Sequence, residues 1–116
     1  MTQATFRHGR RYGTETKTAP CAVSGALGET IDFRQVATAQ LHVPADAPPQ
    51  TIGAYAAPGP DEPFLPIVDE AGSPVAIAVE AGRACNLPAA VYASAFLKLR
   101  GEEGKDFAGT LVVKST

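Results

Sequence analysis

The chain consists of short segments in which apolar and polar residues alternate, separated by glycine and proline. All ten prolines and nine of the eleven glycines fall after residue 17. This spacing leaves no uninterrupted window of about 12 residues for an amphipathic helix before about residue 89. Alternation with a period of two between such breakers is typical of half-buried antiparallel strands. The pattern therefore predicts an all-β fold of about eight short strands.

The clearest alternation runs from Val36 to Val43, and Pro44 ends it. Because successive side chains of a strand point to opposite faces, the segment divides into two sets. The set predicted to face the core is Ala37, Ala39, Leu41 and Val43. The set predicted to face outward is Val36, Thr38, Gln40 and His42.

A second strand is predicted over Thr51–Ala56, before the breaker Pro58-Gly59-Pro60. Its core-facing set is Ile52, Ala54 and Ala56, which leaves Thr51, Gly53 and Tyr55 outward. Farther along, Phe64–Val68 and Pro74–Val79 flank the turn-rich segment Asp69-Glu70-Ala71-Gly72-Ser73. This arrangement predicts a β-hairpin.

The remaining strands are predicted over Ala19–Val23, Thr30–Phe33, Ala84–Leu87, Phe96–Arg100 and Thr110–Lys114. Pro88 begins a segment to Ser94 that predicts a single helical turn. One sheet of this composition could not hide its apolar face, so we expect an antiparallel two-sheet sandwich or jelly roll. The predicted organisation is an extended N-terminal arm, residues 1–17, and a β-sandwich domain, residues 18–116.

Length and composition agree with one globular domain. The chain has 116 residues, of which 45% are apolar and 19% charged, enough for one modest core. The apolar runs are far shorter than the roughly 18 to 20 residues of a membrane span, so we expect a soluble protein without membrane contact. The first residues lack the apolar core of a secretory signal, and we expect synthesis in the cytoplasm without export.

The two cysteines, Cys21 and Cys85, lack the spacing of a metal site. We interpret them first as small buried apolar residues and second as a mutual disulfide. We assign them no function.

Charge is distributed unevenly along the chain. Residues 1–17 contain Arg7, Arg10, Arg11 and Lys17 against Glu15, a balance of +3, whereas six basic and eleven acidic residues give the remainder −5. Such a split often marks a tail that binds an acidic surface. Four basic groups attract nucleic acid only weakly, so we favour the acidic surface of a neighbouring protein, and a solvated tail is the alternative.

Candidate catalytic groups are sparse. Nucleophilic catalysis needs a nucleophile beside a base, and the two histidines are His8, in the arm, and His42, on the polar face of a predicted strand. Phosphate-binding, dinucleotide-binding and zinc motifs are absent from the sequence. The acidic pairs Asp61-Glu62, Asp69-Glu70 and Glu102-Glu103 fall in turns, where solvated acids are the rule. We therefore predict a protein that is not an enzyme and binds no cofactor or metal.

One possible ligand face emerges from the alternation. Five residues are predicted on outward faces of strands, namely Gln40, His42, Tyr55, Lys98 and Arg100. If their strands were neighbours, an aromatic ring surrounded by hydrogen-bonding groups could bind a sugar. The alternative is that these residues form ordinary polar exteriors on separate sheets.

The order of strands and turns resembles that of a known group of proteins. The residues that carry the resemblance are Ala39–Pro44, Phe64–Gly72, Ala81–Arg83, Leu87-Pro88 and Phe96–Leu99. Between about Asp32 and Lys114 the chain is similar to small β-sandwich virion proteins of tailed bacteriophages and gene transfer agents. This resemblance implies a capsid decoration protein or the base of a head spike or fibre. It supplies no active-site residues, and the arm lies outside it.

Together these observations give two hypotheses. The first is a non-enzymatic structural component of a phage-like particle, assembled in the host cytoplasm, whose arm docks onto a neighbouring subunit. Its expected partners are other virion or capsid proteins and further copies of itself, and nucleic acid is an unlikely partner. The second is a carbohydrate-binding β-sandwich that uses the Tyr55, His42 and Arg100 face. The two are compatible, because a head spike can contact cell-surface polysaccharide.

Overall fold

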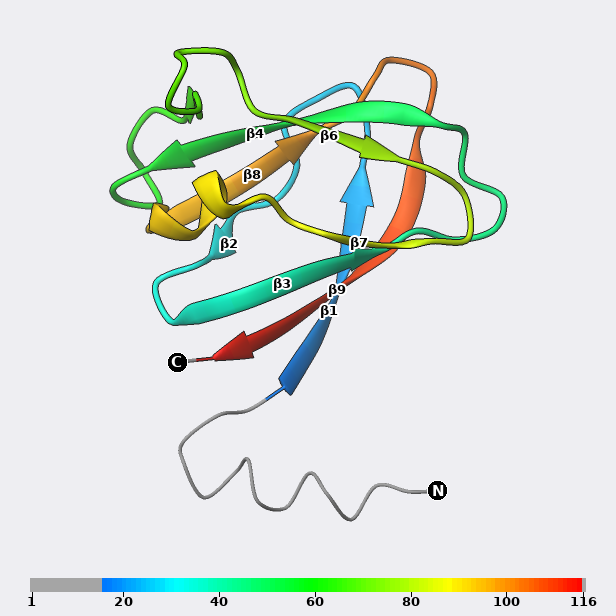
Figure 1. Cartoon of the computed structure of the whole chain (residues 1–116), viewed down its shortest axis with the longest axis horizontal. Helices are drawn as coiled ribbons and strands as arrows, with labels where there is room; N and C mark the ends of the chain where they lie inside the picture. The colour runs from blue at the N-terminus through cyan, green and yellow to red at the C-terminus, as the bar shows by residue number, and fades with distance from the viewer. Residues whose placement is uncertain (1–15, 116) are drawn as a thin grey trace.

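A computed structural model describes residues 16–115 of the chain, and these form nine strands and one short 3₁₀ helix (Figure 1). One sheet has four strands in the order β1 (Thr16–Val23), β9 (Phe107–Ser115), β3 (Val36–His42) and β7 (Ala84–Asn86). The other has five strands, β2 (Ile31–Asp32), β8 (Phe96–Arg100), β4 (Gln50–Ala57), and both β5 (Leu65–Pro66) and β6 (Ala76–Val79) beside β4. All pairings between these strands are antiparallel.

Successive strands alternate between the two sheets. Only β4, β5 and β6 follow one another within one sheet; each of the other connections in residues 16–115 crosses to the opposite sheet. The 3₁₀ helix η1 (Ala89–Ala93) lies in the crossing from β7 to β8, as the Pro88–Ser94 segment predicts. The structure thus confirms the all-β fold with two packed antiparallel sheets.

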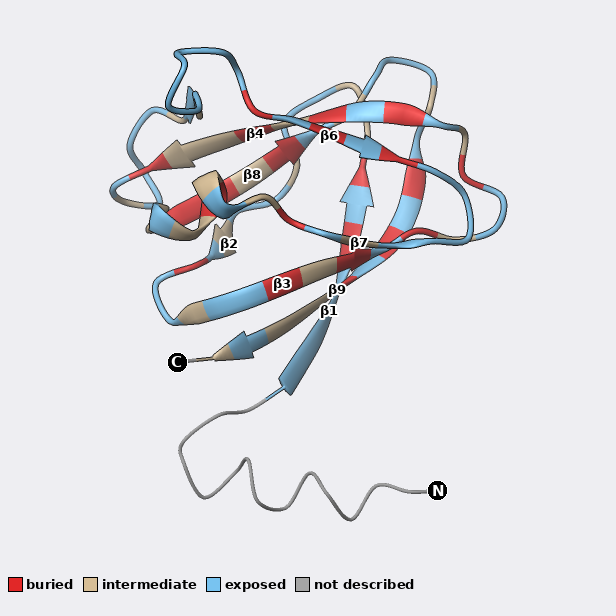
Figure 2. Cartoon of the chain, in the orientation of Figure 1, coloured by how far each residue is buried: buried red, intermediate tan, exposed pale blue. Residues whose placement is uncertain are grey.

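The core lies between the sheets, where the inward faces of both contribute large apolar side chains (Figure 2). The largest fully buried side chains are Val23, Phe33, Leu41, Ile52, Val91, Leu97 and Leu99. Burying a side chain of this size contributes about 1.5 to 3 kcal/mol to stability. The alternation in β3, β4 and β8 therefore places apolar side chains of both sheets in one shared core.

The beginning of β3 differs from the predicted alternation. A register shift between Val36 and Thr38 in the pairing with β9 marks a β-bulge at Ala37. Ala37 is consequently exposed, while Val36 packs against the core. The predicted inward position of Ala37 and outward position of Val36 are therefore wrong, whereas Ala39, Leu41 and Val43 are buried as predicted.

The predicted hairpin between Phe64–Val68 and Pro74–Val79 is confirmed only at its turn, where the Val75 amide donates to Ile67 (2.8 Å) and the Asp69 amide donates to Ser73 (2.8 Å). The strands β5 and β6 themselves do not pair with each other. β5 and β6 run in the same direction along the same edge of β4. The Ile67 amide donates to Ala54 (2.9 Å), and Ala76 already stands opposite the adjacent Gly53. Residues 68–74 therefore form an excursion from one interrupted edge strand, closed by a bridge between Val68 and Pro74.

Tyr92 of η1 contacts β3 at the point where β7 ends. Its ring stacks on Phe33, with centroids 5.9 Å apart. The backbone N–H of Ala39 donates to the Tyr92 hydroxyl (2.9 Å), which donates toward the carbonyl oxygens of Ala39 (3.1 Å) and Leu87 (3.3 Å). One hydroxyl thus satisfies backbone groups at the point where the ladder between β3 and β7 ends.

Replacing Tyr92 by Phe keeps the stacked ring and leaves the Ala39 N–H without its acceptor. An unsatisfied buried donor costs about 1 to 3 kcal/mol, so we expect the free energy of unfolding to fall by that amount in a urea titration. Tyr55→Phe, on the outer face of the other sheet, serves as the control and should change it by less than about 0.5 kcal/mol. Equal effects of the two substitutions would contradict the assignment.

Candidate functional site

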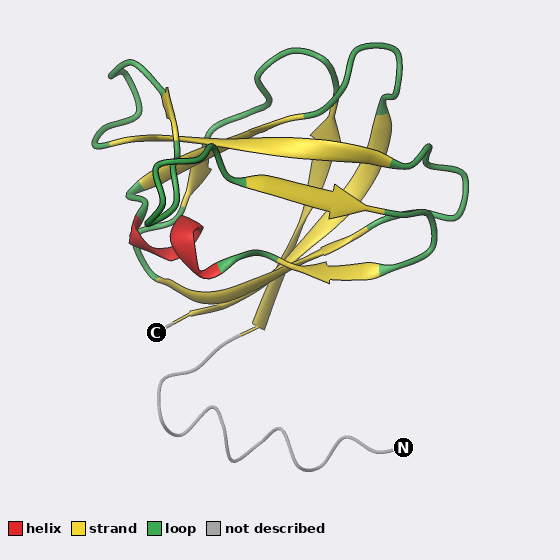
Figure 3. Cartoon of the chain, turned by 45° about the horizontal axis from the view of Figure 1, so that its top comes forward, coloured by secondary structure: helices red, strands yellow, loops and turns green. Residues whose placement is uncertain are grey.

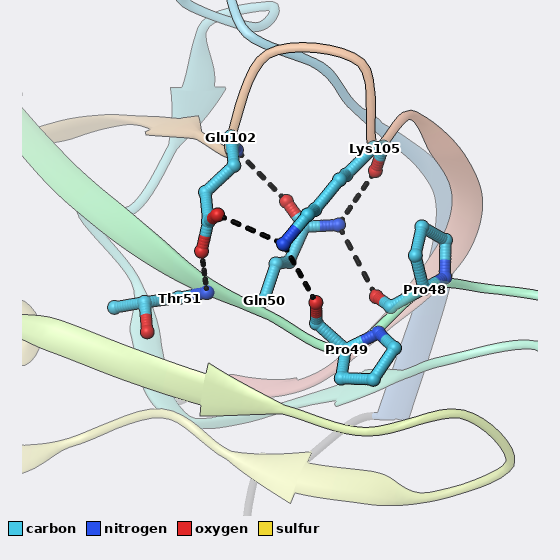
Figure 4. A network of polar contacts seen from close by, with 6 residues as sticks. All are labelled: Pro48, Pro49, Gln50, Thr51, Glu102 and Lys105. Atoms are coloured by element: carbon cyan, nitrogen blue, oxygen red, sulfur yellow. Dashed lines mark hydrogen bonds and ion pairs between the residues drawn. The ribbon is translucent and has the colours of Figure 1, made fainter.

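The densest polar cluster surrounds Gln50 at the start of β4 (Figure 4). Gln50 is the one buried polar side chain of the described residues. Its amide nitrogen donates to the carbonyl oxygen of Lys105 (2.6 Å), and its amide oxygen accepts the backbone N–H of Glu102 (2.9 Å). Gln50 thereby fastens the loop of residues 101–106, between β8 and β9, onto the first residue of β4.

Glu102 and Lys105 complete this network above the amide (Figure 4). The Glu102 carboxylate accepts the backbone N–H of Thr51 (2.8 Å) and pairs with the Lys105 ammonium (3.0 Å). The hydrogen bond from Thr51, followed by the contact with Lys105, lowers the pKa of Glu102. This carboxylate was predicted to be an ordinary solvated turn residue, whereas the structure gives it specific partners.

The Gln50 amide is closely surrounded by its own chain. A β-carbon at Gly101 would lie 2.7 Å from Val23 Cγ1 and still closer to the Gln50 amide oxygen. Each polar group of the Gln50 amide already has a backbone partner. We therefore interpret the cluster as a clamp that closes one end of the sandwich.

The five residues of the predicted ligand face do not share one surface. Gln40 and His42 lie on β3 in the four-stranded sheet, where Gln40 donates to Asn86 Oδ1 (2.9 Å) and lies 3.0 Å from His42 Nε2. Tyr55 is on β4, and Lys98 and Arg100 are on β8, in the five-stranded sheet. The outward faces of the two sheets point away from each other, so the predicted grouping of His42 with Tyr55 and Arg100 is wrong.

Tyr55, Lys98 and Arg100 nevertheless lie together on the outer face of the five-stranded sheet. Tyr55 stands directly opposite Lys98 in the pairing of β4 with β8, and Gly53 stands opposite Arg100. The Lys98 ammonium lies 4.6 Å from the centroid of the Phe64 ring, a cation–π contact. We name Tyr55, Phe64, Lys98 and Arg100 the aromatic face. Sequence reasoning missed Phe64, because only the fold brings its ring next to the Lys98 ammonium.

Most of the predicted arm residues, namely Arg7, Arg10 and Arg11, lie outside the described residues. Lys17 is the exception. It belongs to β1, opposite Val113 of β9, so the four-stranded sheet begins at Thr16, two residues before the predicted start of the domain.

A wide apolar groove lies between the 68–74 excursion and η1. Its volume is about 960 Å³, and Figures 1 and 3 show η1 on the same side of the molecule as the loop that leads into β6. We name it the acidic groove, because its lining includes two carboxylates and no basic residue. The lining residues are Val68, Asp69, Glu70, Ala71, Pro74, Val75, Ala76, Pro88, Ala89 and Ala90.

The walls of the acidic groove include an exposed large apolar side chain. Val68 is 53% exposed, one of the three large exposed apolar side chains of the described residues. Asp69 Oδ1 accepts the backbone N–H groups of Ala71 (2.9 Å) and Ser73 (3.0 Å), which fixes the turn. Gly72 adopts a positive φ of 83° there, a conformation that favours glycine. The turn therefore holds Val68 and Glu70 at the rim.

A second groove, of about 390 Å³, opens between the edge strands β1 and β2, and its lining includes Glu29, Asp32 and Cys21. Arg34 binds Asp32 through two hydrogen bonds of 2.9 and 2.7 Å. This contact lowers the pKa of Asp32 to about 2. One of the two carboxylates of this groove is therefore already neutralised by a cation of its own chain.

Both cysteines are free in the structure. Cys21 lies in β1 and Cys85 in β7, at opposite edges of the four-stranded sheet. Strands about 4.8 Å apart place two residues across three spacings well beyond the roughly 7 Å limit for a disulfide. Burial, followed by the proximity of Glu29, raises the pKa of the Cys21 thiol. The packing interpretation fits Cys21, whereas Cys85 is only half-buried.

No helix within residues 16–115 is long and apolar enough to cross a membrane. No group of three or more His, Cys, Asp or Glu side chains there is arranged to hold a metal ion.

The pKa of Glu102 gives a prediction about acid stability. Because its pKa is lower in the folded chain, the carboxylate contributes stability above the ordinary glutamate pKa, about 4.3, and this contribution is lost as the pH falls further. We expect Glu102→Gln to reduce the loss of stability between about pH 6 and pH 3, measured by urea denaturation at each pH. Glu103→Gln, one residue farther along, is the control and should retain the wild-type pH dependence. A Glu102→Gln profile parallel to the wild-type profile would contradict the role of this carboxylate.

Comparison with known proteins supports the fold. No protein-family model matches the chain, and no curated protein sequence matches it significantly. Among solved structures, the crystal structure of the SPBc2 prophage-derived protein YomS is similar, with a TM-score of 0.55 over 88% of this chain and 95% of that chain. The two sequences are 12% identical, so the likeness is one of fold. The predicted resemblance to phage β-sandwich proteins is thus supported at the level of the fold by a phage-derived neighbour, and the specific type of virion protein stays a prediction.

Proposed function

We propose that this protein is a non-enzymatic structural component of a phage-like particle, and that its N-terminal arm docks onto a neighbouring subunit. The observation that carries the proposal is the fold shared with a prophage-derived protein over 88% of this chain. A fold alone fits many functions. The uneven charge of the chain supports the narrower role, because an arm with a balance of +3 precedes a domain with a balance of −5.

The described surface agrees with a role in binding rather than chemistry. Its most connected polar cluster is a closed clamp, and its apolar grooves lie at edges and loops where another chain has access. Within the proposal, capsid decoration and the base of a head spike or fibre are the two roles that the sequence resemblance implies. In both roles the protein would reside on the particle, together with other virion proteins and further copies of itself.

Removing residues 2–15 tests the role of the arm, because this deletion ends before β1 begins at Thr16. We expect the shortened protein to fold and to be absent from purified particles, whereas the full chain is incorporated. Quantitative mass spectrometry of gradient-purified particles measures incorporation, and circular dichroism of the isolated protein checks its folding. Normal incorporation of the folded, shortened protein would contradict arm docking. Absence of the full chain from particles would contradict the virion role itself.

A second candidate function is carbohydrate binding by the aromatic face. Tyr55 and Lys98 are opposite one another, with Phe64 and Arg100 on the same outer surface. An aromatic ring flanked by hydrogen-bond donors is a suitable platform for a sugar ring. His42, which belonged to the predicted face, takes no part in this platform, because it lies on the other sheet.

A glycan array separates the second function from pure assembly. If the aromatic face binds carbohydrate, the protein should bind specific glycans, and Tyr55→Ala should weaken this binding about tenfold or more, as expected for the loss of a stacking ring worth about 1.4 kcal/mol. His42→Ala, on the opposite sheet, is the matched control and should leave binding unchanged. A protein that binds no glycan, or for which both substitutions act equally, would exclude the aromatic face as a sugar site.

A further inference from the structure

We propose that the acidic groove is the docking site for the N-terminal arm of a second copy of this chain. The inference rests on the proposed function, since it names the surface that receives the arm. Its occupant is residues 1–15, a segment outside the described structure. The argument depends on the charge of the groove, its exposed apolar walls and the place where β1 begins.

Charge together with apolar walls selects this groove over the others. The groove lined by Ser24, Gly25, Ala26, Glu103, Gly104 and Asp106 is also acidic, but it offers no large apolar side chain. The acidic groove contains Asp69 and Glu70 and no basic lining residue. Neither carboxylate takes part in any of the ion pairs found between described side chains, which join Asp32 to Arg34, Glu80 to Arg83 and Glu102 to Lys105. In the groove beside β1, by contrast, Arg34 neutralises Asp32. The acidic groove therefore retains two uncompensated negative charges.

The composition of the arm matches both features of the acidic groove. Residues 1–15 contain three arginines, Arg7, Arg10 and Arg11, against one acid, and two aromatic residues, Phe6 and Tyr12. The groove offers carboxylates beside apolar walls formed by two valines, four alanines and two prolines. An aromatic ring buried against such walls, with an arginine next to a carboxylate, is the pairing that often anchors protein interfaces.

The position of β1 favours a neighbouring copy as the source of the arm. Figure 1 shows β1 beginning at the bottom of the view and running upward, whereas the loop that leads into β6 lies at the top. The described chain therefore begins on the side of the molecule away from the loop that forms one wall of its own acidic groove. Fifteen residues span up to about 50 Å when fully extended, which is long enough to reach the groove of an adjacent copy.

Two complementary full-length variants test this docking. Glu70→Lys alters the groove and keeps the arm, whereas Arg10→Glu with Arg11→Glu alters the arm and keeps the groove. Glu70 is chosen over Asp69, because Asp69 fixes the turn through its backbone contacts. Glu62→Lys is the matched control, since it makes the same charge change in another acidic pair, outside the lining of the groove.

Sedimentation velocity at about 50 mM salt measures self-association, where charge contacts are weakly screened. We expect the wild type and Glu62→Lys to associate equally, and each of the two complementary variants to associate about tenfold more weakly, the effect of losing roughly 1.4 kcal/mol. An equimolar mixture of the two variants should associate again, because it combines intact arms with intact grooves. The proposal would be overturned by any of three results. The mixture stays monomeric, the wild type is itself monomeric, or Glu62→Lys weakens self-association as much as Glu70→Lys does.

The outcome is distinguishable from that of the particle experiment. If the mixed variants associate while the arm deletion leaves incorporation into particles unchanged, docking between copies stands and its proposed role in the virion fails. If the arm deletion abolishes incorporation while the mixture stays monomeric, the arm binds a different virion protein, and the acidic groove is not its site.

Discussion

The amide of Gln50 joins two crossings between the sheets that the sandwich requires. Strands that alternate between sheets force the backbone across the ends of the core, where carbonyl and N–H groups leave the ladders. Gln50 begins β4 directly after one crossing. Its side-chain amide hydrogen-bonds the backbone N–H of Glu102 and the carbonyl oxygen of Lys105 in another crossing. An unpaired buried backbone group costs about 1 to 3 kcal/mol, so this one side chain couples the start of β4 to the turn between β8 and β9. Position 101 requires a glycine, because the Gln50 amide and Val23 occupy the space that a β-carbon would take.

The parts of the fold that the sequence predicts are those determined by local alternation. Leu41, Ile52 and Leu99 are buried because each lies in phase with its own strand, and phase is visible in the order of residues. The bulge at Ala37 depends on the register between β3 and β9, which are separated by more than sixty residues. The interrupted edge strand depends on β4, which takes up β5 and β6 in succession. Neither feature has a local signal.

The same distinction explains the candidate surfaces. The alternation correctly assigns Tyr55 and Lys98 to outward faces. It contains no information on which strands share a sheet, so the prediction grouped His42 with residues of the other sheet. Tyr92 and Gln50 were missed because their partners are backbone groups distant in the sequence. The acidic groove combines residues 68–76 with residues 88–90. Its acidic pair was visible in the sequence, whereas its apolar walls became recognisable only when the fold left Val68 exposed.

The distribution of paired and unpaired charges links these surfaces to assembly. The ion pairs found between described side chains join residues two or three positions apart, so those charges are satisfied within their own loops. Asp69 and Glu70 stand apart from these pairs, and the arginines of residues 1–15 belong to the same chain. Under the proposed docking, each copy would offer its arm and accept the arm of another copy, which is a heterologous contact. Such contacts close into a ring or a reciprocal pair, or continue as an open array. The geometry of the arm would then determine which of these assemblies forms, while the sandwich provides a rigid surface on which the contact repeats.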